Sequence, residues 1–237
     1  MKKNVVSDAL RTGLNKTPGR VMRALLWVLA VAVFFVFARY ARYAKIDDFS
    51  GYRTSEMQVF SGVIFAVIYA LAYGVQLRAG RKLPVYMHVL LAVVTGAILL
   101  GKISLLDYVS DDYDIFLANW IYEYSQMGWK EGLGTYIGSD YAPPYLYLMQ
   151  IISRVKDYPP QYLVKAISMA FEVLMAYGIM KISSLKVKGD GARLLIFHIA
   201  SLLPTVVFNG AYWGQCDVIY TSFCLMALYM GLTGRSA

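Results

Sequence analysis

Charged residues are scarce in this chain: they make up 16% of its 237 residues, whereas 58% are hydrophobic. Soluble domains carry roughly 25% charged residues, so the composition excludes an ordinary soluble domain and indicates a protein of the lipid bilayer. The net charge of +8 does not indicate nucleic acid as a partner. The basic residues form short clusters that flank apolar runs, which is typical of membrane proteins.

Cysteine and histidine are also few. Cys216 and Cys224 lie about 12 Å apart on one predicted helix, too far for a mutual disulfide. His88 and His198 stand singly in apolar segments, so we predict no metal-ligand cluster and no cofactor, and nothing indicates a divalent metal. The N-terminus lacks the short basic region and small-residue cleavage site of a signal peptide, and the first apolar run is therefore expected to be an uncleaved span.

The apolar runs predict an all-α polytopic membrane protein with about six transmembrane helices. These are expected around residues 24–38, 59–77, 85–106, 162–182, 194–208 and 218–232. We divide the chain into residues 1–84, with a cytoplasmic N-terminus and two extra helices, and a core module of residues 85–237. Basic clusters place both termini in the cytoplasm; the residues that carry this orientation include Lys2, Arg23, Arg78, Lys82, Lys181, Arg193 and Arg235, with Asp8 as the one acid near the N-terminus.

Residues 107–161 are then a large external loop, and residues 107–144 hold seven of the fifteen acidic residues. Four acids, Asp107, Asp111, Asp112 and Asp114, crowd into eight positions. Such a cluster is often only solvated surface. The alternative is an acid/base or cation-binding site, because the repulsion between close carboxylates is a cost that a site explains.

Two interfacial helices are expected in this loop. Tyr113, Leu117, Trp120 and Tyr124 form one apolar-aromatic face at helical spacing. Residues 143–155 are mainly apolar but too few to cross the bilayer, and crossing would move the basic cluster at 181–193 to the outer face. Between them, four glycines at positions 128, 132, 134 and 138 predict a loop.

Residues 209–217 should reach the same outer face as the acidic stretch. Asp217 can either cap the helix that follows or belong to a site. Lys165 and Glu172 are seven residues apart and share one helix face, so we predict a structural pair, with Lys165 also able to reach an anionic headgroup. Lys102 lies near the outer end of its span and is expected to snorkel.

Four segments together resemble the GT-C superfamily of membrane glycosyltransferases, and more narrowly the bacterial proteins related to the second mannosyltransferase of GPI-anchor assembly. They are SDDYDIFLANWI (110–121), DYAPPYLYL (140–148), LVKAISMAFEVLMAY (163–177) and FNGAYWGQCDVIYTSF (208–223). Asp140 stands where that family usually has Asn, and Glu172 where it commonly has Asp.

The resemblance implies transfer of a sugar, mannose or another hexose, from a polyprenyl-phosphate donor to a glycan or glycolipid acceptor outside the cytoplasm. It implies a bacterial plasma membrane location, with the active site on the outer face among membrane lipids. Asp112, with Asp111 as second choice, corresponds to the carboxylate that acts as general base. Lys165, Arg154 and Lys156 are the expected donor-phosphate ligands; the expected substrate-binding residues are Tyr113, Trp120, Tyr141, Tyr145, Trp213, Gln215 and Asp217.

Members of that superfamily usually carry several more spans beyond this point. The alternative is therefore a non-catalytic or split-partner subunit of a glycan or glycolipid assembly complex, with a second membrane chain supplying helices. A transporter is disfavoured because the charges cluster outside the spans and no broken-helix repeat is visible.

Overall fold

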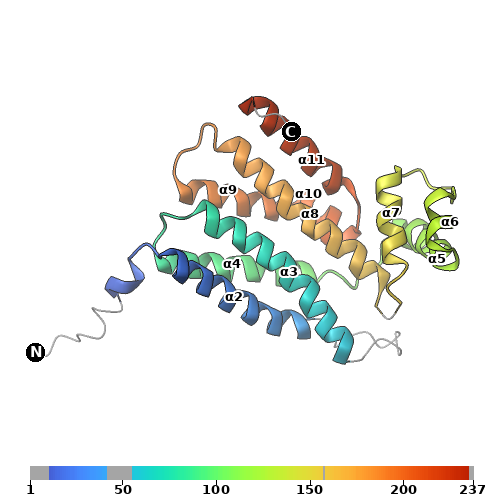
Figure 1. Cartoon of the computed structure of the whole chain (residues 1–237), viewed down its shortest axis with the longest axis horizontal. Coiled ribbons are helices and arrows are strands. Elements are labelled where there is room, and N and C mark those ends of the chain that lie inside the picture. The colour runs from blue at the N-terminus through green and yellow to red at the C-terminus, as the bar shows by residue number, and fades with distance from the viewer. Residues whose placement is uncertain (1–10, 42–54, 157, 235–237) are drawn as a thin grey trace, which may run out of the picture.

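The computed structural model describes residues 11–41, 55–156 and 158–234, which contain helices and no strands. The orientation prediction rests in part on Lys2, Asp8 and Arg235, which lie outside these residues. Figure 1 shows a bundle of long helices with a small helical cap at one end. The α-helices are α2 (Arg20–Tyr40), α3 (Ser55–Ala79), α4 (Val85–Ile103), α5 (Ala118–Gln126), α6 (Trp129–Gly134), α7 (Pro143–Ile152), α8 (Pro160–Ser183), α9 (Asp190–Leu202), α10 (Pro204–Val207) and α11 (Asp217–Thr233). Two π-helical turns, η1 (Tyr113–Leu117) and η2 (Phe208–Trp213), precede α5 and α11.

Four helices, α2, α3, α4 and α8, are long and apolar enough to cross a membrane. A fifth crossing is possible if α9 continues through the bend into α10 and η2. Helix α11 has 17 residues, or about 26 Å of rise, which is shorter than the roughly 30 Å hydrocarbon core. The described residues thus support four or five spans, fewer than the six predicted.

The predicted span at 194–208 is not one straight helix. Helix α9 ends at Leu202, and the chain then bends by 50° into Pro204–Trp213. Leu203 has a non-helical backbone with ψ of 128°, because the ring of Pro204 disfavours helical geometry in the residue before it. The bend turns η2 toward the cap.

Helix α8 is the centre of the bundle. In the most apolar 18 residues of α8, 61% of the residues are buried, whereas in those of α2, at the periphery, 11% are buried. Helix α2 packs on α3, where Phe34 stacks on Tyr69 with ring centroids 4.4 Å apart. The predicted boundary at residue 84 falls in the turn between α3 and α4, and one hydrophobic core continues across it.

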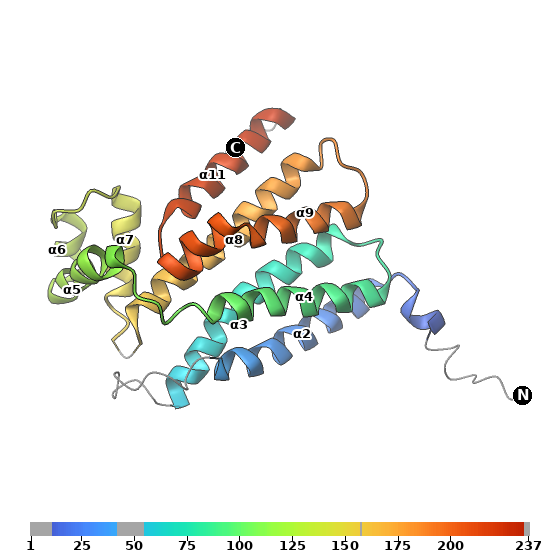
Figure 2. The same cartoon turned by 180° about the vertical axis from the view of Figure 1, so that it is seen from behind.

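The cap consists of η1 and helices α5, α6 and α7, and it lies beside the end of α8 that follows Pro159 (Figures 1 and 2). Its own apolar core includes Trp120, Tyr124, Tyr145 and Met149. Helix α7 has ten residues, about 15 Å of rise, so this segment is too short to span, as predicted.

The glycine-rich segment of the cap is not a continuous loop, because α6 forms at Trp129–Gly134. The Glu131 carboxylate accepts the Gly128 N–H at 3.2 Å and so caps the helix start. Gly132 lies directly against Gln150 and Tyr124, so its missing side chain allows α6 to pack closely on its neighbours. Glycine content alone therefore misidentified this segment.

Candidate functional site

Asp112 lies at the start of η1, where the chain leaves α4 and enters the cap. Its Oδ2 atom accepts the indole N–H of Trp213 at 2.7 Å and the side-chain amide N–H of Gln215. In the part of the chain that the structure describes, no donor is bonded to Oδ1. One carboxylate oxygen is thus fixed by two donors, while the other remains free to take a proton.

The turn after η2 delivers both donors to Asp112. Gly214 has φ of +84°, a left-handed conformation that favours glycine and reverses the chain between Trp213 and Gln215. The backbone on either side is anchored, because Ser110 Oγ donates to the Trp213 carbonyl at 2.7 Å and Ser168 Oγ donates to the Gln215 carbonyl at 2.9 Å. The loop before η1, helix α8 and the η2 turn therefore form one connected unit.

The orientation of the Gln215 amide is set from the cap. Tyr141 Oη donates to Gln215 Oε1 at 3.1 Å, which leaves the amide nitrogen facing Asp112. Burial, followed by the nearby Cys216 thiol and the Asp112 and Asp217 carboxylates, raises the pKa of Tyr141 to about 12. The phenol consequently stays protonated and remains a donor at any physiological pH.

Asp112 borders two hollows. The first, of about 280 Å³, lies on the cap side and is lined by Asp112, Phe116, Leu117, Trp120, Asp140 and Tyr141. The second, of about 550 Å³, is more open and is lined by Asp112, Thr205, Phe208, Asn209, Trp213, Gln215 and Asp217. Asp112 is the residue common to both linings, so the two hollows adjoin at this residue.

The structure brings together most of the predicted site residues. Trp120 and Tyr141 line the first hollow, and Trp213, Gln215 and Asp217 line the second. Tyr145 instead lies in the apolar core of the cap, and Tyr113 packs against the same core. Asp111 is exposed and lines neither hollow, whereas Asp112 lines both.

The three predicted phosphate ligands lie in different surroundings, and none is at Asp112. Lys165 is buried, and its ammonium donates to the carbonyl oxygens of Leu105, Leu106 and Tyr108 at 3.1, 3.1 and 2.6 Å. Arg154 donates to the Met127 carbonyl at 2.9 Å on the cap surface, and Lys156 is exposed. None of the three lines either hollow.

The predicted pair of Lys165 and Glu172 is wrong. Glu172 pairs with Lys102 of α4, and both side chains are buried, so Lys102 does not snorkel. Residues seven apart are separated by about 10 Å along a helix, and each found a nearer partner on another segment. Lys165 donates to carbonyls of the segment that follows α4, where a cation is also favoured by the helix dipole.

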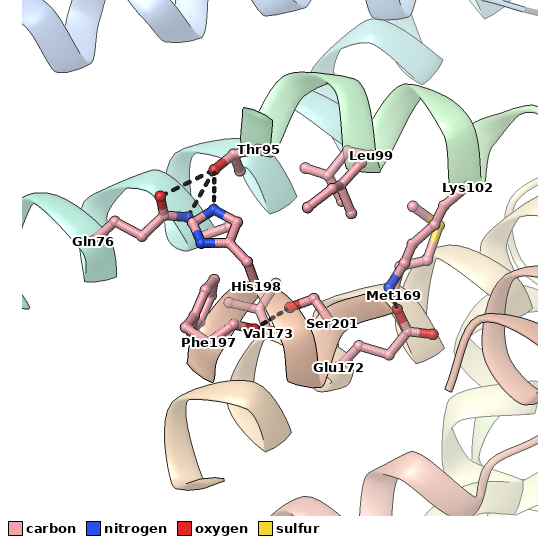
Figure 3. Close-up of a pocket in the computed structure, with 12 residues that line it drawn as sticks. Gln76, Thr95, Leu99, Lys102, Met169, Glu172, Val173, Phe197, His198 and Ser201 are labelled. Atoms are coloured by element: carbon pink, nitrogen blue, oxygen red, sulfur yellow. Dashed lines mark hydrogen bonds and ion pairs between the residues drawn. The ribbon is translucent and has the colours of Figure 1, made fainter. Parts of the chain in front are cut away.

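The Lys102–Glu172 pair and a separate polar group line one small cavity inside the bundle (Figure 3). Gln76, Thr95 and His198 form the second group, with Gln76 Nε2 donating to Thr95 Oγ1 at 2.8 Å. They surround a cavity of about 20 Å³, enough for roughly one water molecule. Glu172 also lies directly against Gly210 in η2, where any side chain would overlap its Oε1 atom.

Six hollow-lining residues were not predicted as site residues: Phe116, Leu117, Asp140, Thr205, Phe208 and Asn209. All of them except Thr205 lie within the segments that resemble GT-C enzymes, so the signal was present but not used. Asn209 also donates to Asp217 Oδ2 at 3.0 Å, which orients a predicted residue. Thr205 lies just after the bend at Pro204; the proline is a sequence signal for a helix break that was not used.

Among the described residues, no three His, Cys, Asp or Glu side chains gather closely enough to hold a metal ion. The fold and site define a helical bundle with membrane-compatible helices and a carboxylate between two hollows at one end. Comparison with known proteins identifies no relative: the chain matches no protein-family model, no curated protein and no solved structure.

Proposed function

We propose that this protein is a membrane glycosyltransferase that uses Asp112 as its general base. The observation that carries the proposal is the position of the Asp112 carboxylate, fixed through Oδ2 and bordering both hollows. A transferase must bring a donor and an acceptor to one reacting centre, and two adjoining hollows with a shared carboxylate suit that requirement. The four segments that resemble GT-C enzymes support the choice of sugar transfer.

The proposed reaction is a displacement at the anomeric carbon of a polyprenyl-phosphate sugar. The acceptor hydroxyl forms the new C–O bond, its proton passes to Asp112, and the bond from the anomeric carbon to the phosphate oxygen breaks with the electron pair leaving on the phosphate. Trp120 and Tyr141 supply aromatic surface for the sugar ring in the first hollow. Attack from the second hollow, opposite the leaving group, would invert the anomeric centre.

The departing phosphate carries negative charge that needs stabilisation. No lysine or arginine lines either hollow among the described residues. This favours a second candidate function, in which the chain is one subunit of a split enzyme and a partner membrane chain supplies the cation.

The proposed orientation follows the basic residues. Arg78, Arg81, Lys181 and Arg193 lie at the end of the bundle away from the cap (Figure 1). The positive-inside rule assigns that end to the cytoplasm and hence the Asp112 site to the outer face of a plasma membrane.

The catalytic proposal is tested with Asp112→Asn in membranes supplied with a polyprenyl-phosphate hexose. Loss of the proton acceptor should lower transfer by about 100-fold or more. The matched control is Asp111→Asn, an adjacent exposed carboxylate that borders neither hollow and should retain activity. Unchanged transfer by Asp112→Asn would refute the proposed base.

Mild purification separates the two candidate functions. Sugar transfer by the purified chain alone supports a self-sufficient enzyme. A second membrane chain present in equal amount, whose removal abolishes transfer, supports the split enzyme.

A further inference from the structure

A basic hollow of about 490 Å³ lies at the end of the bundle away from Asp112. It is formed where α3 ends, α8 ends and α9 begins, segments that gather at this end in both views (Figures 1 and 2). Arg78, Arg81, Lys181 and Arg193 line it, together with Ser184, and no acidic residue does. Cations from three separate helix ends therefore converge on one cavity.

The positive charge of this hollow is poorly compensated. Within the described part of the chain, Arg78, Arg81 and Lys181 form no ion pair with a carboxylate. The nearby acid, Asp190, lies 3.6 Å from a terminal nitrogen of Arg193 and also accepts the Lys82 backbone N–H at 3.4 Å. One acid beside four cations leaves a local excess of positive charge.

One cation of the hollow is held by aromatic rings, and another has a nitrogen without a hydrogen-bond partner. The Lys181 ammonium lies over the ring of Tyr229, 4.9 Å from its centroid, and near that of Tyr177 at 6.0 Å. The Nε of Arg193 is buried and has no hydrogen-bond partner. A buried donor without an acceptor is costly, so a ligand that offers an oxygen atom to Arg193 would be stabilising.

The lining of the hollow is not only basic. Val75, Ala79 and Met180 provide apolar surface in the same hollow. An amphiphile with an anionic head and a hydrocarbon tail matches this arrangement, since the cations can hold the head while the tail lies along the helices. Basic residues that only satisfied the positive-inside rule would not need to enclose a hollow or leave a buried donor unpaired.

We infer that this hollow binds the phosphate group of an anionic membrane lipid from the leaflet on that side. Arginine suits the role because its planar guanidinium can donate two parallel hydrogen bonds to phosphate oxygens. Basic pockets between transmembrane helices are known to hold lipid head groups. This site is separate from the Asp112 hollows and does not depend on the proposed transferase activity.

The test uses the full-length protein in detergent, with native mass spectrometry to count bound lipid during titration with phosphatidylglycerol and, separately, phosphatidylcholine. The variant Arg78→Gln/Arg193→Gln should bind phosphatidylglycerol about tenfold more weakly than the unaltered protein. The control Lys186→Gln/Lys188→Gln removes the same charge from exposed residues outside the hollow and should bind normally. A second hollow variant, Arg81→Gln, changes an exposed turn residue and should weaken binding as well. It keeps the inference testable if the double variant does not fold.

Thermal unfolding without added lipid confirms that each variant is folded. Equal phosphatidylglycerol binding by the unaltered protein and by both hollow variants would overturn the inference. Equally strong binding of phosphatidylcholine, whose head group has no net charge, would also overturn it. A second arm titrates millimolar inorganic phosphate: if phosphate binding depends on Arg78 and Arg193 while lipid binding does not, the ligand is a soluble phosphate compound and the assignment to lipid fails.

Discussion

At the scale of single residues, two side chains fix the Asp112 carboxylate and leave one of its oxygen atoms open. Trp213 and Gln215 both donate to Oδ2, so the carboxylate cannot rotate freely about its Cβ–Cγ bond. Hydrogen bonds to a charged group are stronger than neutral ones, at about 1.5–3 kcal/mol each. Losing either donor should therefore affect positioning more than folding.

We predict that Trp213→Phe lowers sugar transfer by about tenfold, because the phenyl ring keeps most of the aromatic surface but lacks the N–H that Asp112 accepts. The measurement is the transfer rate in membranes at saturating donor. Trp129→Phe serves as control, since Trp129 is exposed on the cap and lines neither hollow. Equal rates for both variants would show that the indole N–H does not position the base.

The buried Lys102–Glu172 pair makes a second prediction at this scale. Lys102→Met alone should destabilise the protein by about 3–5 kcal/mol, because Glu172 is left buried without a counter-charge. Lys102→Met combined with Glu172→Met should recover much of that loss, since no unpaired charge remains. Thermal unfolding of the two single variants and the double variant in detergent measures the coupling. Additive losses would mean that the two side chains do not interact.

Residue identities could be predicted from sequence better than residue partners. The Asp-Tyr and Trp-Gly-Gln segments pointed to Asp112, Trp213 and Gln215, and the alternation of spans placed them on one face. The partner of Glu172 could not be read in this way. Whether an acid on α8 meets Lys165 or Lys102 depends on the rotation of α4 against α8, and a pattern within one helix carries no information about that angle.

At the scale of elements, η2 is the segment that joins the membrane bundle to the site. It packs on α8 through Gly210, which lies against Glu172, and it ends at Gly214, where the chain reverses toward Asp112. The absence of a side chain at position 210 is thus a condition for the observed position of Trp213 and Gln215.

We predict that Gly210→Ala lowers sugar transfer by about tenfold or more, because the new methyl group would overlap Glu172 and displace η2 from α8. Gly101→Ala on α4 is the matched control, since a Cβ there meets nothing within 4 Å. Transfer rates of the two variants, normalised to folded protein, provide the comparison. Full activity of Gly210→Ala would show that η2 tolerates displacement.

Some helices could be predicted from the sequence better than others. Long apolar runs predicted α2, α3, α4 and α8 within a few residues, because a helix must satisfy its backbone inside a bilayer. Helix α6 was missed because glycine usually marks loops, while here a close approach to Gln150 requires it. The bend after α9 was missed because Pro204 was read as part of a continuous apolar run.

At the scale of the whole molecule, the two ends of the bundle differ in charge. One carries Asp112 and the cap, and the other carries the basic hollow. This difference determines the proposed orientation in the membrane.

In a background without Cys224, we predict that a cysteine at Tyr136 reacts with a membrane-impermeant thiol reagent in intact cells, because Tyr136 is 78% exposed on the cap. A cysteine at Lys188, between α8 and α9, should react only after the cells are opened. Reaction of Lys188→Cys in intact cells would reverse the proposed orientation.

The bend at Pro204 has a consequence for kinetics. It brings Thr205 and Phe208 to the second hollow, and the apolar side chain of Phe208 is 57% exposed. This hollow therefore opens beside a surface suited to hydrocarbon rather than water. If a glycolipid acceptor enters there, it arrives by lateral diffusion. Turnover would then follow its mole fraction among the surrounding lipids, and diluting it with inert phospholipid would slow the reaction at constant bulk concentration.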